Sequence, residues 1–218
     1  MEWLEDYLKR VPEGCGTFRV HRRETVRYEP ARMRRIAIIG SAGAGKSTLA
    51  RQLGAILGLK VIHLDSLFWH PGWVETPRDE WIRVQEELVT EDAWVIDGNY
   101  RGTMDIRLAA ADTIIFLDLP RRICLWRVVR RRFQYAGRAR PDMAPGCVEQ
   151  LDWEFLKWVW AFPSRERPDV LRKLAEYADG RQVIVLRRPA DVARFLAEIS
   201  RARASQPPAP PPSRGRCG

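Results

Sequence analysis

The middle of the chain alternates short apolar runs with longer segments in which apolar residues recur every three or four positions. Five runs rich in β-branched residues predict strands, at 36–39, 61–64, 94–96, 113–117 and 183–186. Six segments predict helices, at 46–57, 78–89, 121–133, 148–160, 167–177 and 190–199. This alternation is typical of crossover connections, so we expect an α/β fold with a five-stranded parallel sheet flanked by helices.

The spacing also predicts which face of a helix is buried. Helix 46–57 carries one apolar face, formed by Leu49, Leu53, Ile56 and Leu57. Helix 121–133 carries another, formed by Ile123, Trp126, Val129 and Phe133. We expect both faces to pack against the sheet.

Both ends of the 218-residue chain differ from this middle part. Residues 1–32 mix charges with few apolar periods, and residues 205–218 are rich in proline, glycine and serine. We therefore expect an N-terminal extension at 1–32, one domain at 33–204, and a disordered proline-rich tail from 205. Neither end contributes a predicted strand.

The composition, 45% hydrophobic and 30% charged, is typical of a globular protein. No run reaches the roughly 18 apolar residues of a membrane span, and the first residues lack the layout of a secretory signal, so we expect a cytoplasmic protein without membrane contact. The cysteines at 15, 124, 147 and 217 are widely spaced. This spacing indicates neither a disulfide framework nor a four-thiolate zinc site.

The formal net charge is +9, and much of it lies in one segment. Residues 121–140 hold eight arginines and no acidic residue. Such a cluster suits a nucleic acid, a membrane surface or a phosphorylated small molecule, and it also occurs on ordinary solvated faces.

The most specific motif is Gly40–Ser47, which reads G-x-x-x-x-G-K-S between a predicted strand and a predicted helix. Glycines let the backbone wrap a phosphate at the positive end of a helix, while the lysine contacts the β- and γ-phosphates and the serine ligates Mg²⁺. The motif predicts a P-loop NTPase fold that binds ATP and Mg²⁺. The expected nucleotide-binding residues are Gly40, Ser41, Ala42, Gly43, Ala44, Gly45, Lys46, Ser47 and Thr48.

Two carboxylates follow the next two predicted strands, Asp65 and Asp97, and Arg101 comes four residues after the second. The carboxyl ends of parallel strands share one edge, where ligands bind, so these residues are expected beside the phosphates. Asp65 there orients or deprotonates an acceptor hydroxyl, or it caps a nearby helix. The aromatic loop at 68–73 stacks a planar substrate such as a base, or it packs beneath the loop.

Five segments carry a resemblance to a known family: GSAGAGKST at 40–48, HLDSLFWHPGW at 63–73, VIDGNYRGT at 95–103, FLDLPRR at 116–122, and RPDM with the following GC at 140–147. Over about residues 34–200 the chain resembles adenylate-kinase-like P-loop phosphotransferases. More narrowly, it is similar to small bacterial proteins named DNA topology modulation proteins.

The resemblance implies roles for further residues. Asp97 would organise the water shell of Mg²⁺, Arg101 would contact phosphate, and Arg127 and Arg131 would contact the nucleotide at the hinge of a lid at about 134–147. Asn99 and Tyr100 replace the Phe and Pro of the family motif, which leaves the usual nucleoside-monophosphate acceptor open.

These observations favour an ATP- and Mg²⁺-dependent phosphotransferase that acts on a small-molecule acceptor, a nucleoside or nucleotide among the candidates. The expected catalytic residues are Lys46, Asp65, Arg101, Arg127, Arg131, Arg138 and Arg140, the last four neutralising charge where a lid closes. The alternative is an ATP-binding regulator that associates with nucleic acid and transfers no phosphate. The sequence does not specify an oligomeric state.

Overall fold

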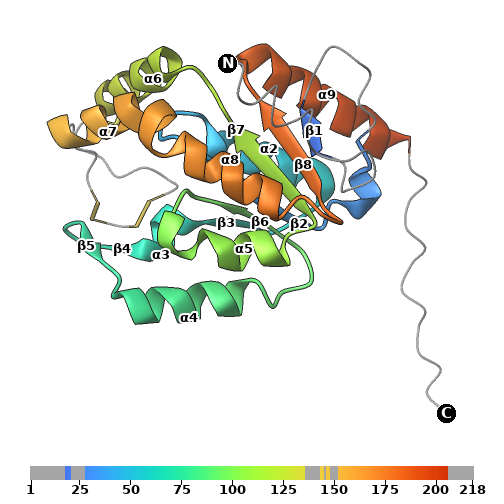
Figure 1. The fold of residues 1–218 in the computed structure, drawn as a ribbon, viewed down its shortest axis with the longest axis horizontal. Helices are drawn as coiled ribbons and strands as arrows, with labels where there is room; N and C mark the ends of the chain where they lie inside the picture. Colours follow the sequence, from blue (N-terminus) through green and yellow to red (C-terminus); the bar gives the residue numbers. More distant parts are fainter. Residues whose placement is uncertain (1–17, 21–27, 136–142, 145, 148–151, 206–218) are drawn as a thin grey trace.

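The computed structural model describes residues 18–20, 28–135, 143–144, 146–147 and 152–205. Its main sheet is wholly parallel, with the strand order β1-β8-β7-β2-β6-β3 (Figure 1). The strands are β1 (Phe18–Val20), β2 (Arg35–Gly40), β3 (Val61–His63), β6 (Trp94–Asp97), β7 (Thr113–Leu117) and β8 (Gln182–Leu186). The five predicted strands and the α/β class are therefore confirmed.

The sixth strand, β1, lies within residues 1–32, for which no strand was expected. It pairs with β8, and Phe18 stands opposite Val183. Tyr28, from the same part of the chain, is buried with its ring 4.8 Å from that of Phe195, edge to face. The expectation was wrong because three residues are too few to show the alternation that reveals a strand.

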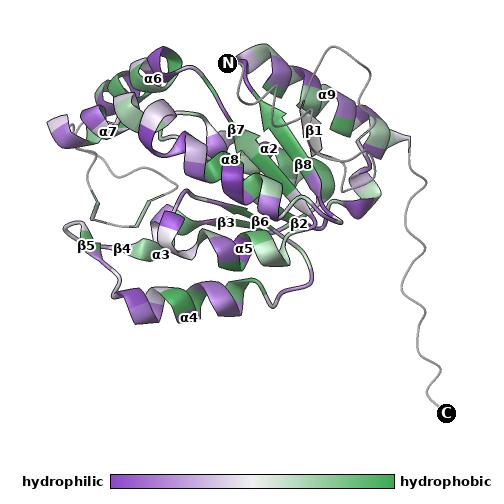
Figure 2. Ribbon diagram, viewed as in Figure 1, coloured by the Kyte–Doolittle hydropathy of each residue, from purple (hydrophilic) through white to green (hydrophobic). Residues whose placement is uncertain are grey.

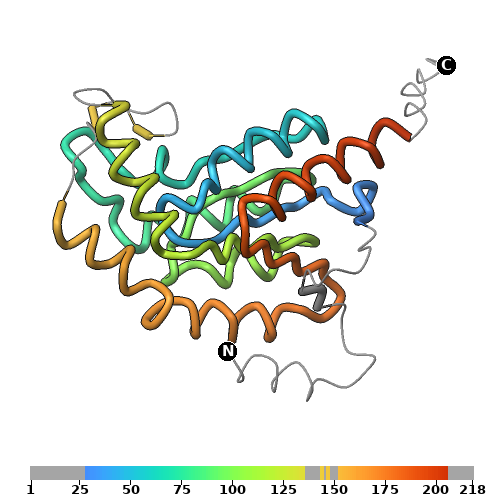
Figure 3. The backbone as a smooth tube through the Cα atoms, turned by 90° about the horizontal axis from the view of Figure 1, so that it is seen from above, coloured from blue at the N-terminus to red at the C-terminus, as the bar shows by residue number. Residues whose placement is uncertain are grey.

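Helices cover both faces of this sheet. One face packs against α2 (Lys46–Leu57), α6 (Arg121–Gln134) and α9 (Pro189–Ala204), and α2 lies beside α9 (Figure 3). The other face packs against α4 (Arg78–Leu88), α5 (Met104–Ala110) and α8 (Arg167–Glu176), while α7 (Trp153–Arg165) packs on both α6 and α8. Strands β7 and β8 are strongly hydrophobic along their length (Figure 2), as expected for strands covered on both faces.

The apolar face predicted for α2 is confirmed, since Leu49 and Leu53 are buried and Ile56 and Leu57 pack against the core. The apolar face predicted for α6 is not the side of the helix that is buried, so this prediction is wrong. Trp126 is 59% exposed and Phe133 76% exposed. The buried residues of α6 are Cys124 and Val128, and the helix turns this side to the loop that follows β2.

Several short elements had no prediction. After β3 come α3 (Leu64–Phe68) and an antiparallel hairpin of β4 (Trp69–His70) and β5 (Val74–Glu75). Two 3-10 turns, η1 (Pro30–Arg32) and η2 (Arg101–Thr103), precede β2 and α5. Helix α7 begins at Trp153, five residues later than predicted, and residues 148–151 lie outside the described part. In the described ranges, no helix has the length and apolar character needed to cross a membrane.

The substitution Gly54→Ala tests how closely α2 packs on the edge of the sheet. A Cβ atom at Gly54 would lie 2.3 Å from Val61 Cγ2. Alanine favours a helix by about 1 kcal/mol over glycine, but the forced separation costs roughly 1–3 kcal/mol. We expect the free energy of unfolding to fall by about 1 kcal/mol in urea titrations. Gly102→Ala is the control, because its Cβ would meet open space; equal effects of the two changes would contradict this packing.

Candidate nucleotide and acceptor site

The loop between β2 and α2 has the conformation that a phosphate-binding loop requires. Gly43 and Gly45 have φ values of 74° and 98°, in the left-handed region that side chains rarely adopt. A Cβ atom on Gly43 would lie 2.3 Å from the carbonyl oxygen of Cys124 in α6. The loop therefore needs glycine here both for its backbone angles and for its contact with α6.

Lys46, the first residue of α2, folds back over this loop. Its Nζ donates a hydrogen bond to the carbonyl oxygen of Ser41 at 3.1 Å. Burial lowers the pKa of Lys46, an effect that the negative charges of Asp65 and Asp97 partly offset. A phosphate group beside Nζ would supply the negative partner that favours the charged ammonium.

Helix α6 brings two of the expected arginines to the loop. Arg127 donates a hydrogen bond from its guanidinium to the carbonyl oxygen of Ala44 at 3.0 Å. The positive charge of Arg131 is near enough to Lys46 to lower its pKa further. Arg138 and Arg140 lie outside the described residues, so their predicted roles are untested.

A cavity of about 1100 Å³ opens between the loop, α6, α7 and the β4–β5 hairpin. The expected site residues that line it are Ala42, Gly43, Gly45, Lys46, Ser47, Thr48, Asp65, Arg127 and Arg131. The other lining residues include Arg51, Phe68, Trp69, Trp73, Glu75, Asn99, Tyr100 and Met143. Of the loop, Gly40, Ser41 and Ala44 lie behind this lining.

Asp65 lies in the first turn of α3 and faces the cavity. Its Oδ1 accepts a hydrogen bond from the hydroxyl of Tyr100 at 2.9 Å. Burial, followed by the charge of Asp65, raises the pKa of Tyr100, so the phenol stays protonated and keeps donating. Within the described residues, α3 has no side-chain cap, which argues against the helix-capping alternative for Asp65.

Asp97, expected near Mg²⁺, lies one layer behind Asp65. Its side chain is buried, and Oδ1 contacts Nδ1 of His63, the residue opposite it in the neighbouring strand. Asp97 does not belong to the described lining of the cavity. The negative charge of Asp97 nevertheless acts to raise the pKa of Lys46.

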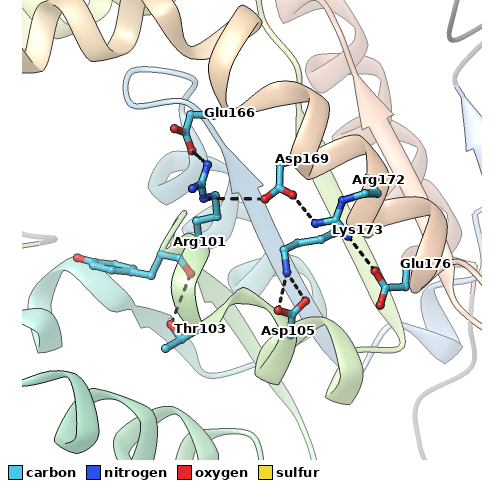
Figure 4. A network of polar contacts seen from close by, with 9 residues as sticks. Arg101, Thr103, Asp105, Glu166, Asp169, Arg172, Lys173 and Glu176 are labelled. Carbon is cyan, nitrogen blue, oxygen red and sulfur yellow. Dashed lines mark hydrogen bonds and ion pairs between the residues drawn. The ribbon is translucent and has the colours of Figure 1, made fainter.

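Arg101 turns away from the cavity. Its guanidinium donates to Glu166 at 3.4 Å and lies 3.9 Å from Asp169, both at the start of α8 (Figure 4). On the same side, Lys173 of α8 is paired with Asp105 of α5. The predicted contact of Arg101 with phosphate stays a prediction.

The sequence reasoning missed a second arginine, Arg107, which is only 1% exposed. It donates to Gln85 and to the carbonyl oxygens of Thr103 and Gly98, the latter two at 3.4 Å. Burial lowers the pKa of Arg107 to about 10. These bonds fix the loop that presents Tyr100. No helix was predicted at 104–110, and nothing in this stretch of the sequence indicated a buried arginine.

The hairpin and three described residues between α6 and α7 form one apolar cluster. Met143, Ala144 and Cys147 are buried against Trp69 and Trp73, and Sγ of Cys147 lies 3.2 Å from the carbonyl oxygen of His70. The aromatic loop lines the cavity and also packs against these three residues. The packing interpretation is therefore confirmed, and the stacking of a planar substrate stays a prediction.

The residues present fit ATP with Mg²⁺. Gly43 and Gly45 have the left-handed backbone angles with which a loop wraps a phosphate, and Ser47 lines the cavity. Over the described ranges, no three His, Cys, Asp or Glu side chains gather as a metal site. Magnesium needs no such cluster, because it binds through few protein ligands, waters and substrate phosphates.

Comparisons with known proteins give distant relatives. No family model matches the chain. It is 28% identical over 127 residues to the uncharacterized protein YqaC of Bacillus subtilis (strain 168), which covers 57% of this chain and 70% of YqaC.

Solved structures with a similar arrangement include several kinases. Shikimate kinase from Acinetobacter baumannii in complex with shikimate has a TM-score of 0.49 and 17% identity, covering 77% of this chain and 90% of its own. A gluconokinase from Sinorhizobium meliloti 1021 has a TM-score of 0.46 and 15% identity, covering 79% and 93%. Deoxyadenosine kinase from M. mycoides has a TM-score of 0.46 and 13% identity, covering 78% and 98%.

Proposed function

We propose that this protein is an ATP- and Mg²⁺-dependent phosphotransferase that acts on a small-molecule acceptor. The observation that carries the proposal is the cavity shared by the glycine loop and Asp65. A donor phosphate held by the loop and an acceptor hydroxyl beside Asp65 would meet in this one space. Holding two reactants in such a geometry is a large part of phosphoryl-transfer catalysis.

The loop amides, Lys46 and Ser47 would hold the triphosphate together with Mg²⁺. The metal, when bound, would neutralise part of the charge of the phosphates. Asp97 would act on its water shell from the second layer, where His63 orients the carboxylate. Asp65, fixed by the Tyr100 hydroxyl, would accept the proton of the acceptor hydroxyl.

Arginines would stabilise the charge that develops on the transferred group. Arg127 and Arg131 already face the cavity from α6. Arg138 and Arg140 join this proposal as residues of the lid, whose closure would exclude water. Arg101 takes part only if it leaves Glu166 and Asp169.

A second candidate is an ATP-binding regulator that associates with nucleic acid. It is favoured by the outer face of α6, where Arg122 and Arg130 are exposed beside Trp126 and Phe133. Arginines can bind phosphates there and aromatic rings can stack bases. This candidate predicts that the protein binds oligonucleotides and that its affinity falls steeply between about 50 and 200 mM salt, because binding releases counterions from the nucleic acid. Fluorescence anisotropy measures this affinity.

Lys46→Ala tests the donor half of the site. The substitution removes the cation inside the phosphate loop, so we expect kcat/KM for MgATP to fall at least 100-fold, about 3 kcal/mol of transition-state stabilisation. ADP release measures it, with Lys60→Ala as control, because Lys60 pairs with Glu91 on the surface. Near-normal activity of Lys46→Ala would refute the assigned role of the loop.

Asp65→Asn tests the acceptor half. It keeps size and shape but cannot accept a proton, so we expect at least a 100-fold loss in the transfer rate, with MgATP affinity changed less than threefold. Tyr100→Phe removes the hydroxyl that donates to Asp65 and that also interacts with Trp69, and should lower the transfer rate about tenfold. Rapid-quench kinetics and MgATP titrations measure the two quantities. Poor MgATP binding with normal transfer at saturation would instead place Asp65 in the metal shell.

A further inference from the structure

The cavity has two ends of different chemistry. All four of its described cationic residues, Lys46, Arg51, Arg127 and Arg131, come from α2 and α6. The other end is built by α3, the β4–β5 hairpin and the loop after β6. It presents aromatic rings and the carboxylates of Asp65 and Glu75. In Figure 1, α6 lies above, and α3 with the hairpin lies below.

Two described arginines around the second end, Arg101 and Arg107, are already engaged. Arg101 pairs with Glu166 and Asp169 and is not among the lining residues. Arg107 is buried behind the wall, where Gln85 and two carbonyl groups take its hydrogen bonds. Among the described residues, this end therefore offers a bound molecule two carboxylates and no cation. The two carboxylates would repel a phosphate monoester, with a charge of about −1.5 to −2, placed beside them.

The rings of this end form a continuous wall. The ring of Trp73 lies 5.3 Å from that of Trp69, Trp69 lies 4.9 Å from Phe68, and Phe68 lies 4.6 Å from Tyr100. Each of the four also lines the cavity. Stacking a base on such a ring contributes about 1–3 kcal/mol. Asp65, the expected acceptor of the hydroxyl proton, lines the same cavity as these rings and Lys46, and its negative charge acts on Lys46.

We propose that the acceptor is a nucleoside that carries no phosphate, with its base on the Trp69–Trp73 wall and a sugar hydroxyl at Asp65. This inference rests on the phosphotransferase activity proposed above. The hydroxyl oxygen forms a bond to the γ-phosphorus of ATP while the bond from that phosphorus to the β–γ bridging oxygen breaks. The electron pair of the broken bond stays on ADP, and the hydroxyl proton passes to Asp65 and then to solvent, giving ADP, a nucleoside monophosphate and one proton.

Matched pairs of acceptors test the proposal on the full chain. Each common ribonucleoside and deoxyribonucleoside is compared with its own 5′-monophosphate in an assay of ADP formation, with MgATP binding measured separately by calorimetry. We expect kcat/KM for at least one nucleoside to exceed that of its monophosphate at least 100-fold. If MgATP binds but no nucleoside is used, or a monophosphate is used as well or better, the acceptor inference is wrong. If MgATP itself does not bind, the proposed function fails as well.

Variants of the wall give a second test. Trp73→Leu should raise the KM for the nucleoside at least tenfold and leave the KM for ATP within twofold. Trp160→Leu, at an exposed tryptophan of α7 outside the described lining of the cavity, is the matched control and should change neither. Glu75→Lys, at an exposed position, should shift the ratio of kcat/KM values at least tenfold toward the monophosphate. An unchanged ratio in Glu75→Lys would overturn the charge argument even if Trp73→Leu did not fold.

Discussion

The close approach of the phosphate loop to α6 is the contact on which the rest of the site depends. Gly43 leaves no room for a side chain against the Cys124 carbonyl, and Arg127 donates to Ala44 across the same contact. Because this side of α6 must face the loop, Arg127 and Arg131 are carried into the cavity. The same rotation leaves Trp126 and Phe133 at the surface. One steric constraint thus determines both the cationic wall of the cavity and the aromatic outer face of the helix.

The opposite wall depends on a buried polar network. Arg107 holds the backbone at Gly98 and Thr103, and the loop between them presents Tyr100 to Asp65. Burying a guanidinium is costly unless its hydrogen bonds are satisfied. Here Gln85 and two backbone carbonyl groups accept the hydrogen bonds of Arg107. This network leaves a carboxylate with a fixed orientation facing Lys46. The two walls meet at the place where phosphoryl transfer would occur.

The sequence was sufficient for the parts of the fold with strong local signals. Five buried strands and the glycine loop follow from runs of β-branched residues and from one motif, and the structure contains them as predicted. Strand β1 was missed because three residues carry no period. The prediction for α6 was wrong because apolar spacing favours burial of the large ring of Trp126 over burial of Cys124. In the structure Cys124 is buried, because this side of α6 contacts the phosphate loop. The Tyr100–Asp65 bond joins residues 35 positions apart, and Arg107 lies in a helix whose pattern shows no site; only tertiary structure reveals either.

Hydrogen–deuterium exchange with and without MgATP tests the central claim, that the loop and α6 form one nucleotide-binding wall. Exchange reports local opening along the backbone, so a bound nucleotide marks the segments that it holds closed. The account predicts that MgATP protects residues 40–48 together with residues 124–131 of α6, and that Lys46→Ala abolishes both effects. Protection confined to other segments, or none at all at saturating MgATP, would contradict it.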